Sequence, residues 1–125
     1  MAENIEKYII GIDIGTGSTK AVAMDIKGKT IADSQIYYTT QSPHPGYAEQ
    51  DPDLIWKAFE DCIKKIIAAV HYPPVSISFS SAMHGLIAVN KQNKPITHLI
   101  TWADTRSEKI AEQIRKSSQA KNIYK

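Results

Sequence analysis

A carboxylate followed at once by glycines and hydroxyl residues is the part of this sequence best suited to chemistry. Residues 13–20 read Asp-Ile-Gly-Thr-Gly-Ser-Thr-Lys and directly follow a short apolar run. Gly15 and Gly17 lack Cβ atoms, so the backbone there can approach an anion closely and turn successive N–H groups toward it. A carboxylate beside such a turn is suited to a metal-bound phosphate.

Two interpretations of this segment remain open on the residues alone. In the first, Asp13 holds Mg²⁺ mostly through water, and Lys20 adds positive charge. The hydroxyls of Thr16, Ser18 and Thr19 then add donors to the phosphate oxygens. In the second, the segment is a plain hairpin turn in which Asp13 bonds its own backbone. The glycine spacing does not fit a Rossmann or P-loop motif.

Three strands are predicted to open the fold. An apolar, β-branched run at residues 8–12 is typical of a strand buried on both faces. Residues 19–24 and 30–38 follow with strand-like patterns, and a Lys-Gly-Lys turn at 27–29 separates them. Together these segments predict an antiparallel start of the sheet.

A long amphipathic helix is predicted after a proline-rich loop at residues 41–50. Asp51 is placed to cap it, Pro52 suits its first turn, and apolar residues then recur at spacings of three and four. The Pro-Pro pair at 73–74 ends it. Cys62, the single cysteine, falls on the apolar stripe and is expected to be a small buried group.

The last third of the chain continues the alternation of strands and helices. Residues 75–80 alternate strictly and predict a strand, and two more strands are predicted at 86–89 and 96–102. Thr105, with Glu108 three residues later, predicts a capping box for a final helix. The order of elements predicts an α/β fold.

Composition limits the classes of function. The chain has 125 residues and 42% hydrophobic content, which suits one domain with one core. Its 15 basic residues exceed its 13 acidic ones by only two and are spread along the chain, so no nucleic-acid surface is expected. No uninterrupted apolar run could cross a membrane. Residues 1–7 carry charges and show no signal peptide, and the single cysteine fits a cytoplasmic protein.

Motifs spread over nearly the whole chain resemble the FGGY carbohydrate kinases. They are the segment at 13–20, Tyr-Ala-Glu-Gln-Asp-Pro at 47–52 followed by Trp56, Ser-Ala-Met-His-Gly at 81–85, and Thr-Trp-Ala-Asp-Thr-Arg at 101–106. The first segment is similar to the first phosphate loop of the actin, chaperone-ATPase and sugar-kinase superfamily. The pairing of Met83 and His84 with the last segment is most similar to bacterial gluconate kinases, and xylulose kinases are close behind.

The resemblance implies a ribonuclease H-like, actin-like ATPase fold with a mixed sheet whose first three strands are antiparallel. It also implies that residues 1–125 form the N-terminal part of the first domain of a longer kinase, an incomplete first lobe without the second lobe. The family's general base, an Asp that accepts the proton of the attacking hydroxyl, would lie beyond residue 125, as would the adenine site. We therefore expect the isolated chain to be inactive.

The implied activity is ATP-dependent transfer of the γ-phosphoryl group to a sugar or sugar acid, with gluconate as the first choice and 6-phosphogluconate as the product. ATP and Mg²⁺ are the implied cofactors, and a homodimer of the complete protein is left open. The resemblance assigns roles by position: Asp13 to the metal, Thr16, Gly17, Ser18 and Lys20 to the phosphates, and Met83, His84 and Trp102 to the sugar.

Structural roles compete with these assignments. His84 could be a core histidine, Met83 could be packing, and Trp102 could be half core and half sugar platform. We assign Trp56 to packing and Arg106 to holding a loop through a carboxylate. The remaining polar residues near these motifs are also given structural roles: Asp104 as a helix cap, and Glu49 and Asp51 flanking a loop and a cap.

Other functions also remain open. The acceptor could be xylulose or another polyol. A non-kinase nucleotide-binding scaffold of the actin or chaperone type would share the Asp13 segment, but it gives no reason for Met83, His84 and Trp102 to occur together. An interaction module without catalysis could instead use an apolar face to meet a partner.

Overall fold

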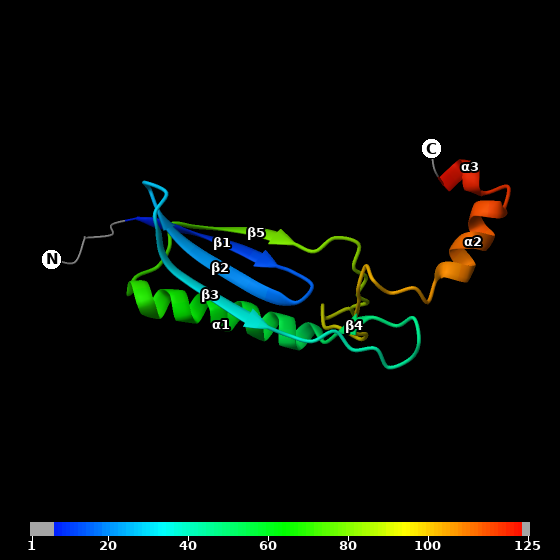
Figure 1. The fold of residues 1–125 in the computed structure, drawn as a ribbon, viewed down its shortest axis with the longest axis horizontal. Helices are drawn as coiled ribbons and strands as arrows, with labels where there is room; N and C mark the ends of the chain where they lie inside the picture. Colours follow the sequence, from blue (N-terminus) through cyan, green and yellow to red (C-terminus); the bar gives the residue numbers. More distant parts are fainter. Residues whose placement is uncertain (1–6, 124–125) are drawn as a thin grey trace.

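The computed structural model describes residues 7–123, and its main body is a four-stranded sheet with one long helix on one face (Figure 1). The strand order is β3-β2-β1-β5. Strands β1 (Tyr8–Ile14), β2 (Ser18–Asp25) and β3 (Thr30–Tyr37) are antiparallel, whereas β5 (Ser76–Ser81) joins β1 in parallel. A mixed sheet with an antiparallel start confirms the predicted α/β architecture.

Helix α1 (Pro52–Val70) begins and ends as the sequence predicts. The Asp51 side chain caps it by accepting a hydrogen bond from the amide of Asp53 at 2.9 Å. At the other end His71 adopts a left-handed conformation with φ of 70° and donates its amide to the carbonyl of Ile67 at 2.8 Å. The helix is therefore fixed at both ends by local hydrogen bonds.

The core lies between α1 and the sheet. Tyr8, Ile10 and Ile12 alternate along β1 and are buried on the helix side. The prediction that this strand is buried on both faces is wrong, because Ile9, on the other face, is 48% exposed. Cys62 and Ile66 of α1 pack against this face, which confirms the buried position expected for the cysteine. No described helix covers the opposite face of the sheet (Figure 1). One face of the sheet thus packs against α1 and forms the core, and no described helix packs on the other face.

Truncation of one core side chain should show how much the packing of α1 stabilises the fold. Ile66 is 1% exposed, so we expect Ile66→Ala to lower the free energy of unfolding by about 2–5 kcal/mol. Ile26 is 82% exposed, and the same substitution there should change it by less than about 0.5 kcal/mol. Urea unfolding followed by circular dichroism measures both. Equal effects would contradict this description of the core.

Strand β5 differs from its prediction in burial. Its alternating pattern predicts one buried face, yet all six residues are exposed. The reason is that α1 packs over β2 and β3, which leaves the helix side of β5 partly open. There the Phe79 ring lies 5.8 Å from Phe59, which in turn contacts Trp56 at 5.1 Å. Trp56 therefore packs along the margin of the helix, as expected, although it is largely exposed.

A small second sheet lies beyond the end of the main one. Strand β4 (Glu49–Gln50) pairs antiparallel with β6 (Leu99–Ile100). The prediction of a strand at 96–102 is thus right in place but too long, and the loop predicted at 41–50 contains a strand. The strand predicted at 86–89 is wrong, because only Leu86 and Val89 form isolated bridges there.

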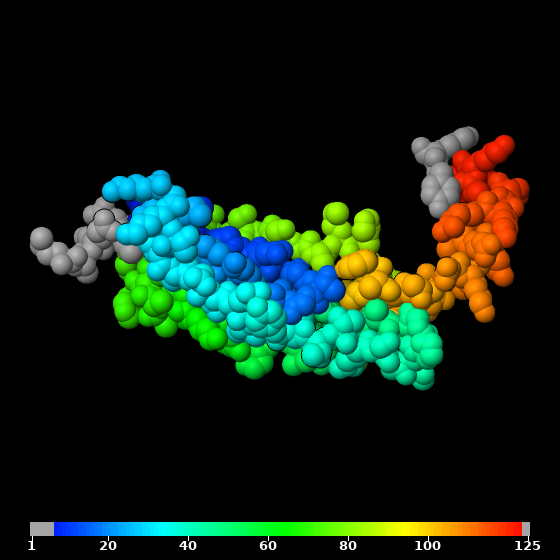
Figure 2. All heavy atoms as spheres, viewed as in Figure 1, coloured from blue at the N-terminus to red at the C-terminus, as the bar shows by residue number. Residues whose placement is uncertain are grey.

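The chain ends in two helices that stand apart from the main sheet (Figures 1 and 2). They are α2 (Glu108–Lys116) and α3 (Ala120–Ile123), and the second was not predicted. The predicted capping box is wrong: Ser107 is the residue before α2, and the Thr105 hydroxyl instead donates to the carbonyl of Gly46 at 3.4 Å. Its hydroxyl is engaged with a distant loop, so it does not cap the helix.

Two sequence predictions concern the location of the protein: that it has no membrane span and that it has no signal peptide. Within residues 7–123, no helix combines the length and the apolar character that membrane spanning requires. The predicted absence of a signal peptide rests mainly on residues 1–6, which lie outside the described residues.

Candidate functional site

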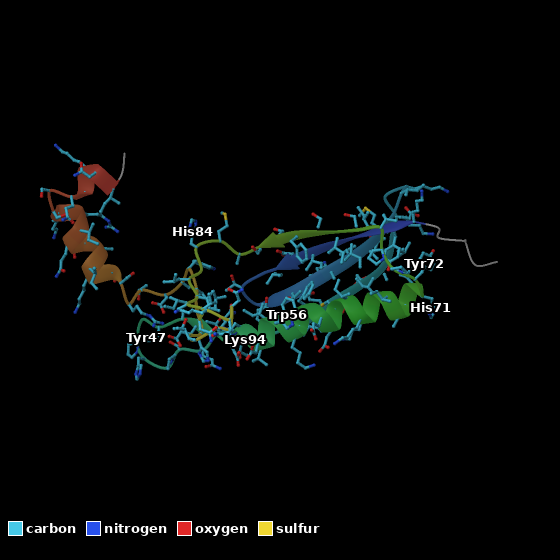
Figure 3. The ribbon with its side chains drawn as sticks, turned by 180° about the vertical axis from the view of Figure 1, so that it is seen from behind. Tyr47, Trp56, His71, Tyr72, His84 and Lys94 are labelled. Carbon is cyan, nitrogen blue, oxygen red and sulfur yellow. The ribbon has the colours of Figure 1, made fainter. Side chains whose placement is uncertain are left out.

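Two of the sequence motifs leave neighbouring parallel strands at the same edge of the sheet. Ile14 of β1 lies opposite Ser81 of β5, and the amide of Ala82 donates to the carbonyl of Ile14 at 2.9 Å. The carboxyl ends of parallel strands are the usual place for ligand sites in open α/β sheets. His84 lies beyond this end of β5, at the opposite end of the sheet from His71 (Figure 3).

The segment after Asp13 is a tight hairpin turn with an open side. The amide of Gly15 donates to the carbonyl of Ser18 at 2.9 Å and closes the turn. The expectation that this N–H binds an anion is therefore wrong. The amides of Thr16 and Gly17 have no acceptor among residues 7–123. Two neighbouring N–H groups, rather than a longer series, are therefore available to a phosphate.

Asp13 lies on the open face of the sheet, directly opposite Lys20 in the β1–β2 register. Its carboxylate makes no hydrogen bond or ion pair with any residue in 7–123, and it lines a hollow of about 380 Å³ with Lys20 and Ser80. The plain-turn interpretation requires a hydrogen bond between the Asp13 side chain and its own backbone, and residues 7–123 of the structure contain no such bond. No group of three or more His, Cys, Asp or Glu in the described part of the chain could hold a metal ion. A Mg²⁺ ion at Asp13 would therefore keep water and phosphate oxygens as its other ligands.

The two hydroxyl residues that start β2 face opposite sides. Ser18 accepts a hydrogen bond at Oγ from Gln35 Nε2 at 2.9 Å. Thr19 is fully buried, and its hydroxyl lies 3.4 Å from the Tyr38 hydroxyl in the interior. The expectation that Thr19 donates to phosphate is therefore wrong, because residues that alternate along a strand point to opposite faces.

Tyr38 supports the turn from the core side. Its hydroxyl donates to the carbonyl of Gly15 at 2.7 Å. Burial raises the pKa of Tyr38 above its ordinary value of 10.0, so the hydroxyl keeps its proton and remains a donor at neutral pH. This support was not predicted, since a tyrosine that ends a strand pattern carries no distinguishing signal.

The predicted sugar residues form one pocket. A cavity of about 200 Å³ is lined by Met83, His84 and Trp102 together with Thr16 of the turn. The Trp102 indole N–H donates to Thr16 Oγ1 at 3.0 Å. Since this bond uses an oxygen lone pair, the Thr16 hydroxyl proton stays available for another acceptor. The structure thus brings one predicted phosphate residue, Thr16, into contact with the predicted sugar residue Trp102. Asp13 and Lys20 line a separate hollow.

The backbone around His84 is constrained. His84 has a φ of 61°, a left-handed conformation that non-glycine residues adopt rarely. At the next position a Cβ added to Gly85 would lie 3.0 Å from Leu99 Cδ1, so a side chain has little room there. Strained conformations of this kind gather at ligand sites, where the surrounding structure holds them.

An ion cluster joins the two loops that flank the pocket. Arg106 donates to Asp104 Oδ2 and to Glu49 Oε1, both at 2.6 Å, and its guanidinium stacks 3.7 Å from the centre of the Tyr47 ring. Asp104 also accepts from the amide of Ala48 at 2.8 Å. Arg106 therefore holds a loop as predicted, whereas Asp104 bridges two loops and does not cap α2.

This cluster predicts how stability depends on pH. Hydrogen bonds from Arg106, and then from backbone amides, hold the pKa of Asp104 well below its ordinary value of 3.8. Because this pKa is lower in the folded state than in the unfolded state, the Asp104 carboxylate stabilises the fold fully at pH values above 3.8. This stabilisation is lost as the pH falls below 3.8. We expect Arg106→Met to lower Tm at pH 7. The difference in Tm between the variant and the wild type should be smaller at pH 3.

The control for this prediction is an exposed ion pair. Lys57 lies 3.0 Å from Asp61 on the surface of α1, where solvent screens the interaction. Lys57→Met should change Tm much less than Arg106→Met in a thermal melt. A pH-independent difference between Arg106→Met and wild type would contradict the role of the Asp104 carboxylate.

Comparison with known proteins identifies the family. Residues 8–125 match the N-terminal domain of the FGGY family of carbohydrate kinases. The chain belongs to the FGGY carbohydrate kinase family. Among its relatives are a gluconokinase of Bacillus licheniformis, 46% identical over 121 residues, and a xylulose kinase of Staphylococcus xylosus, 36% identical over 111 residues.

The FGGY fold is confirmed by a solved structure. The crystal structure of a gluconate kinase from Lactobacillus acidophilus superposes with a TM-score of 0.88 at 37% identity, over 94% of this chain and 24% of that one. The fold is therefore the actin-like ATPase fold of FGGY sugar kinases. The match to the gluconokinase uses 94% of this chain and 23% of that relative. The match to the xylulose kinase uses 88% of this chain and 23% of that relative. The chain thus spans about a quarter of the length of these FGGY kinases.

Proposed function

We propose that this chain supplies the phosphate loop and one wall of the sugar pocket of a longer, cytoplasmic, ATP-dependent carbohydrate kinase whose acceptor is gluconate. The observation that carries the proposal is the pocket in which Thr16 meets Met83, His84 and Trp102. A hydroxyl that receives a phosphoryl group must lie beside the phosphate that supplies it. Thr16, whose amide has no acceptor among residues 7–123, lines this pocket.

Each of these residues has its own role in the proposed phosphoryl transfer. When bound, ATP supplies the γ-phosphoryl group: the acceptor oxygen bonds to the γ-phosphorus while the bond to the β-phosphate oxygen breaks and ADP leaves. The amides of Thr16 and Gly17 and the hydroxyls of Thr16 and Ser18 bind phosphate oxygens, and Lys20 adds positive charge. Asp13 would hold Mg²⁺. We place the general base that takes the hydroxyl proton outside residues 1–125.

Xylulose is the second candidate for the acceptor. The relative from Staphylococcus xylosus, at 36% identity, is a xylulose kinase, so family membership is compatible with both sugars. A small pocket with apolar and aromatic walls discriminates weakly between related polyols. Membership in the family favours a sugar kinase of either kind over a scaffold of the actin type.

The test is an assay of the complete gene product that carries this chain, called the complete kinase below. ADP formation is measured with gluconate, xylulose and glycerol. We expect kcat/KM to be highest for gluconate, and a preference for xylulose would assign the second candidate. Absence of any sugar-dependent ADP formation would contradict the proposal.

The 125-residue chain alone should show no sugar-dependent turnover. The reason is that the general base is placed outside it, so an acceptor hydroxyl would keep its proton. The same coupled assay, run with gluconate and ATP at high protein concentration, measures this. Gluconate-dependent ADP formation by the isolated chain would show that its own residues complete the catalytic machinery.

A further inference from the structure

Gln50 is a buried polar side chain that touches the phosphate turn. It lies in β4 and is 2% exposed. Its Nε2 donates to the backbone carbonyl of Thr16 and, at 3.0 Å, to Thr40 Oγ1. Both hydrogens of the amide nitrogen are therefore used, which offsets the cost of burying the group.

The hydrogen bond to Thr16 fixes more than one atom. The carbonyl of Thr16 and the N–H of Gly17 belong to the same planar peptide unit, and in a trans peptide they point in opposite directions. By holding the carbonyl, Gln50 therefore directs the Gly17 N–H away from itself. That N–H is one of the two in the turn without an acceptor among residues 7–123.

The small sheet presents a second donor to the same residue. Gln50 pairs with Leu99 of β6, and two residues after β6 the Trp102 indole donates to Thr16 Oγ1 at 3.0 Å. Thr16 is thus held at its carbonyl from β4 and at its hydroxyl from the segment after β6. The wall of the sugar pocket and the phosphate turn form one hydrogen-bonded unit.

We infer that Gln50 is a positioning residue for phosphoryl transfer, which orients the Gly17 amide toward the phosphate and fixes the turn against the sugar pocket. The inference rests on the proposed kinase function. This role differs from that of a sugar ligand, the other role open to a residue that lines the pocket. The two roles predict different kinetics.

The kinetic test uses Gln50→Met, which keeps the approximate volume but removes both donors, and Gln50→Glu, which places a carboxylate oxygen against the Thr16 carbonyl. In the complete kinase we expect kcat to fall by about tenfold to a hundredfold, with the KM for sugar changed by less than about threefold. The matched control is Gln113→Glu on the exposed surface of α2, which should keep wild-type kinetics. An unchanged kcat, or a raised KM for sugar alone, would overturn the inference.

A second measurement keeps the inference testable if the complete kinase proves inactive. In ¹⁵N spectra of the 125-residue chain, Gln50→Met should shift and broaden the Gly17 amide resonance, because its peptide plane loses the anchor. Gly28, which lies in the distant β2–β3 turn, should not change. If the Gly17 resonance stays in place in the folded variant, Gln50 does not orient this amide, whatever the enzyme's activity.

Discussion

Replacement of Asp13 by asparagine is expected to lower kcat of the complete kinase by about a hundredfold to a thousandfold. The carboxylate lies on the open face near the end of β1, with no partner among residues 7–123, and it lines a hollow with Lys20, its neighbour across the strand pair. A carboxylate without a partner contributes charge to a ligand and no structural bond. Asn keeps the shape and removes the charge, so the fold should be unaffected.

Asp33 provides the matched control for Asp13. It is an exposed carboxylate on β3 of the same sheet, and Asp33→Asn makes the same chemical change away from the turn. We expect wild-type kcat and an unchanged Tm for this control. If Asp13→Asn retained more than about a tenth of wild-type kcat at saturating Mg²⁺, the turn would not be the phosphate site.

Replacement of His84 by alanine is expected to raise the KM for sugar by about tenfold to a hundredfold, while the KM for ATP changes little. His84 lines the cavity with Met83 and Trp102, whereas Asp13 and Lys20 line a different hollow. Loss of its imidazole should remove a hydrogen bond to the acceptor and leave the free amides of the turn intact. Initial-rate kinetics with each substrate varied in turn measure the two constants.

The chain offers a close control for the strained backbone of His84. His71 also adopts a left-handed conformation, with a φ of 70° against 61° for His84, but it lies at the end of α1 far from the pocket (Figure 3). His71→Ala carries the same backbone cost without touching the site. A comparable change in the KM for sugar in both variants would show that strain, not contact, explains the effect of His84→Ala.

Elements with a repeating pattern could be predicted from the sequence. Helix α1 carries several apolar residues at spacings of three and four, and a capping Asp51 marks its start. The continuous apolar run predicted strand β1 but not that only one of its faces is buried. Strands β4 and β6 have two residues each, which is too short for any period to show. Their pairing depends on contacts between loops that are distant in sequence.

The site was predictable as motifs but not as a hydrogen-bonded arrangement. Asp13, Met83, His84 and Trp102 stand out by type and spacing, and the parallel pairing of β1 with β5 brings their segments together. The contacts that hold the turn come from Gln50 and Tyr38. No local pattern marks either residue as a support for the turn, so both were missed. Thr105 failed as a cap for the same reason, since its partner is a distant carbonyl.

The most direct test of the phosphate turn is paramagnetic broadening by Mn²⁺ bound to inorganic tripolyphosphate, measured on the ¹⁵N-labelled 125-residue chain. Tripolyphosphate needs no adenine site, and broadening detects weak binding. We predict selective broadening of the Thr16 and Gly17 amides that is lost in Asp13→Asn and spares Gly28. Broadening that spares the turn, or that is the same with and without the Asp13 carboxylate, would contradict the account.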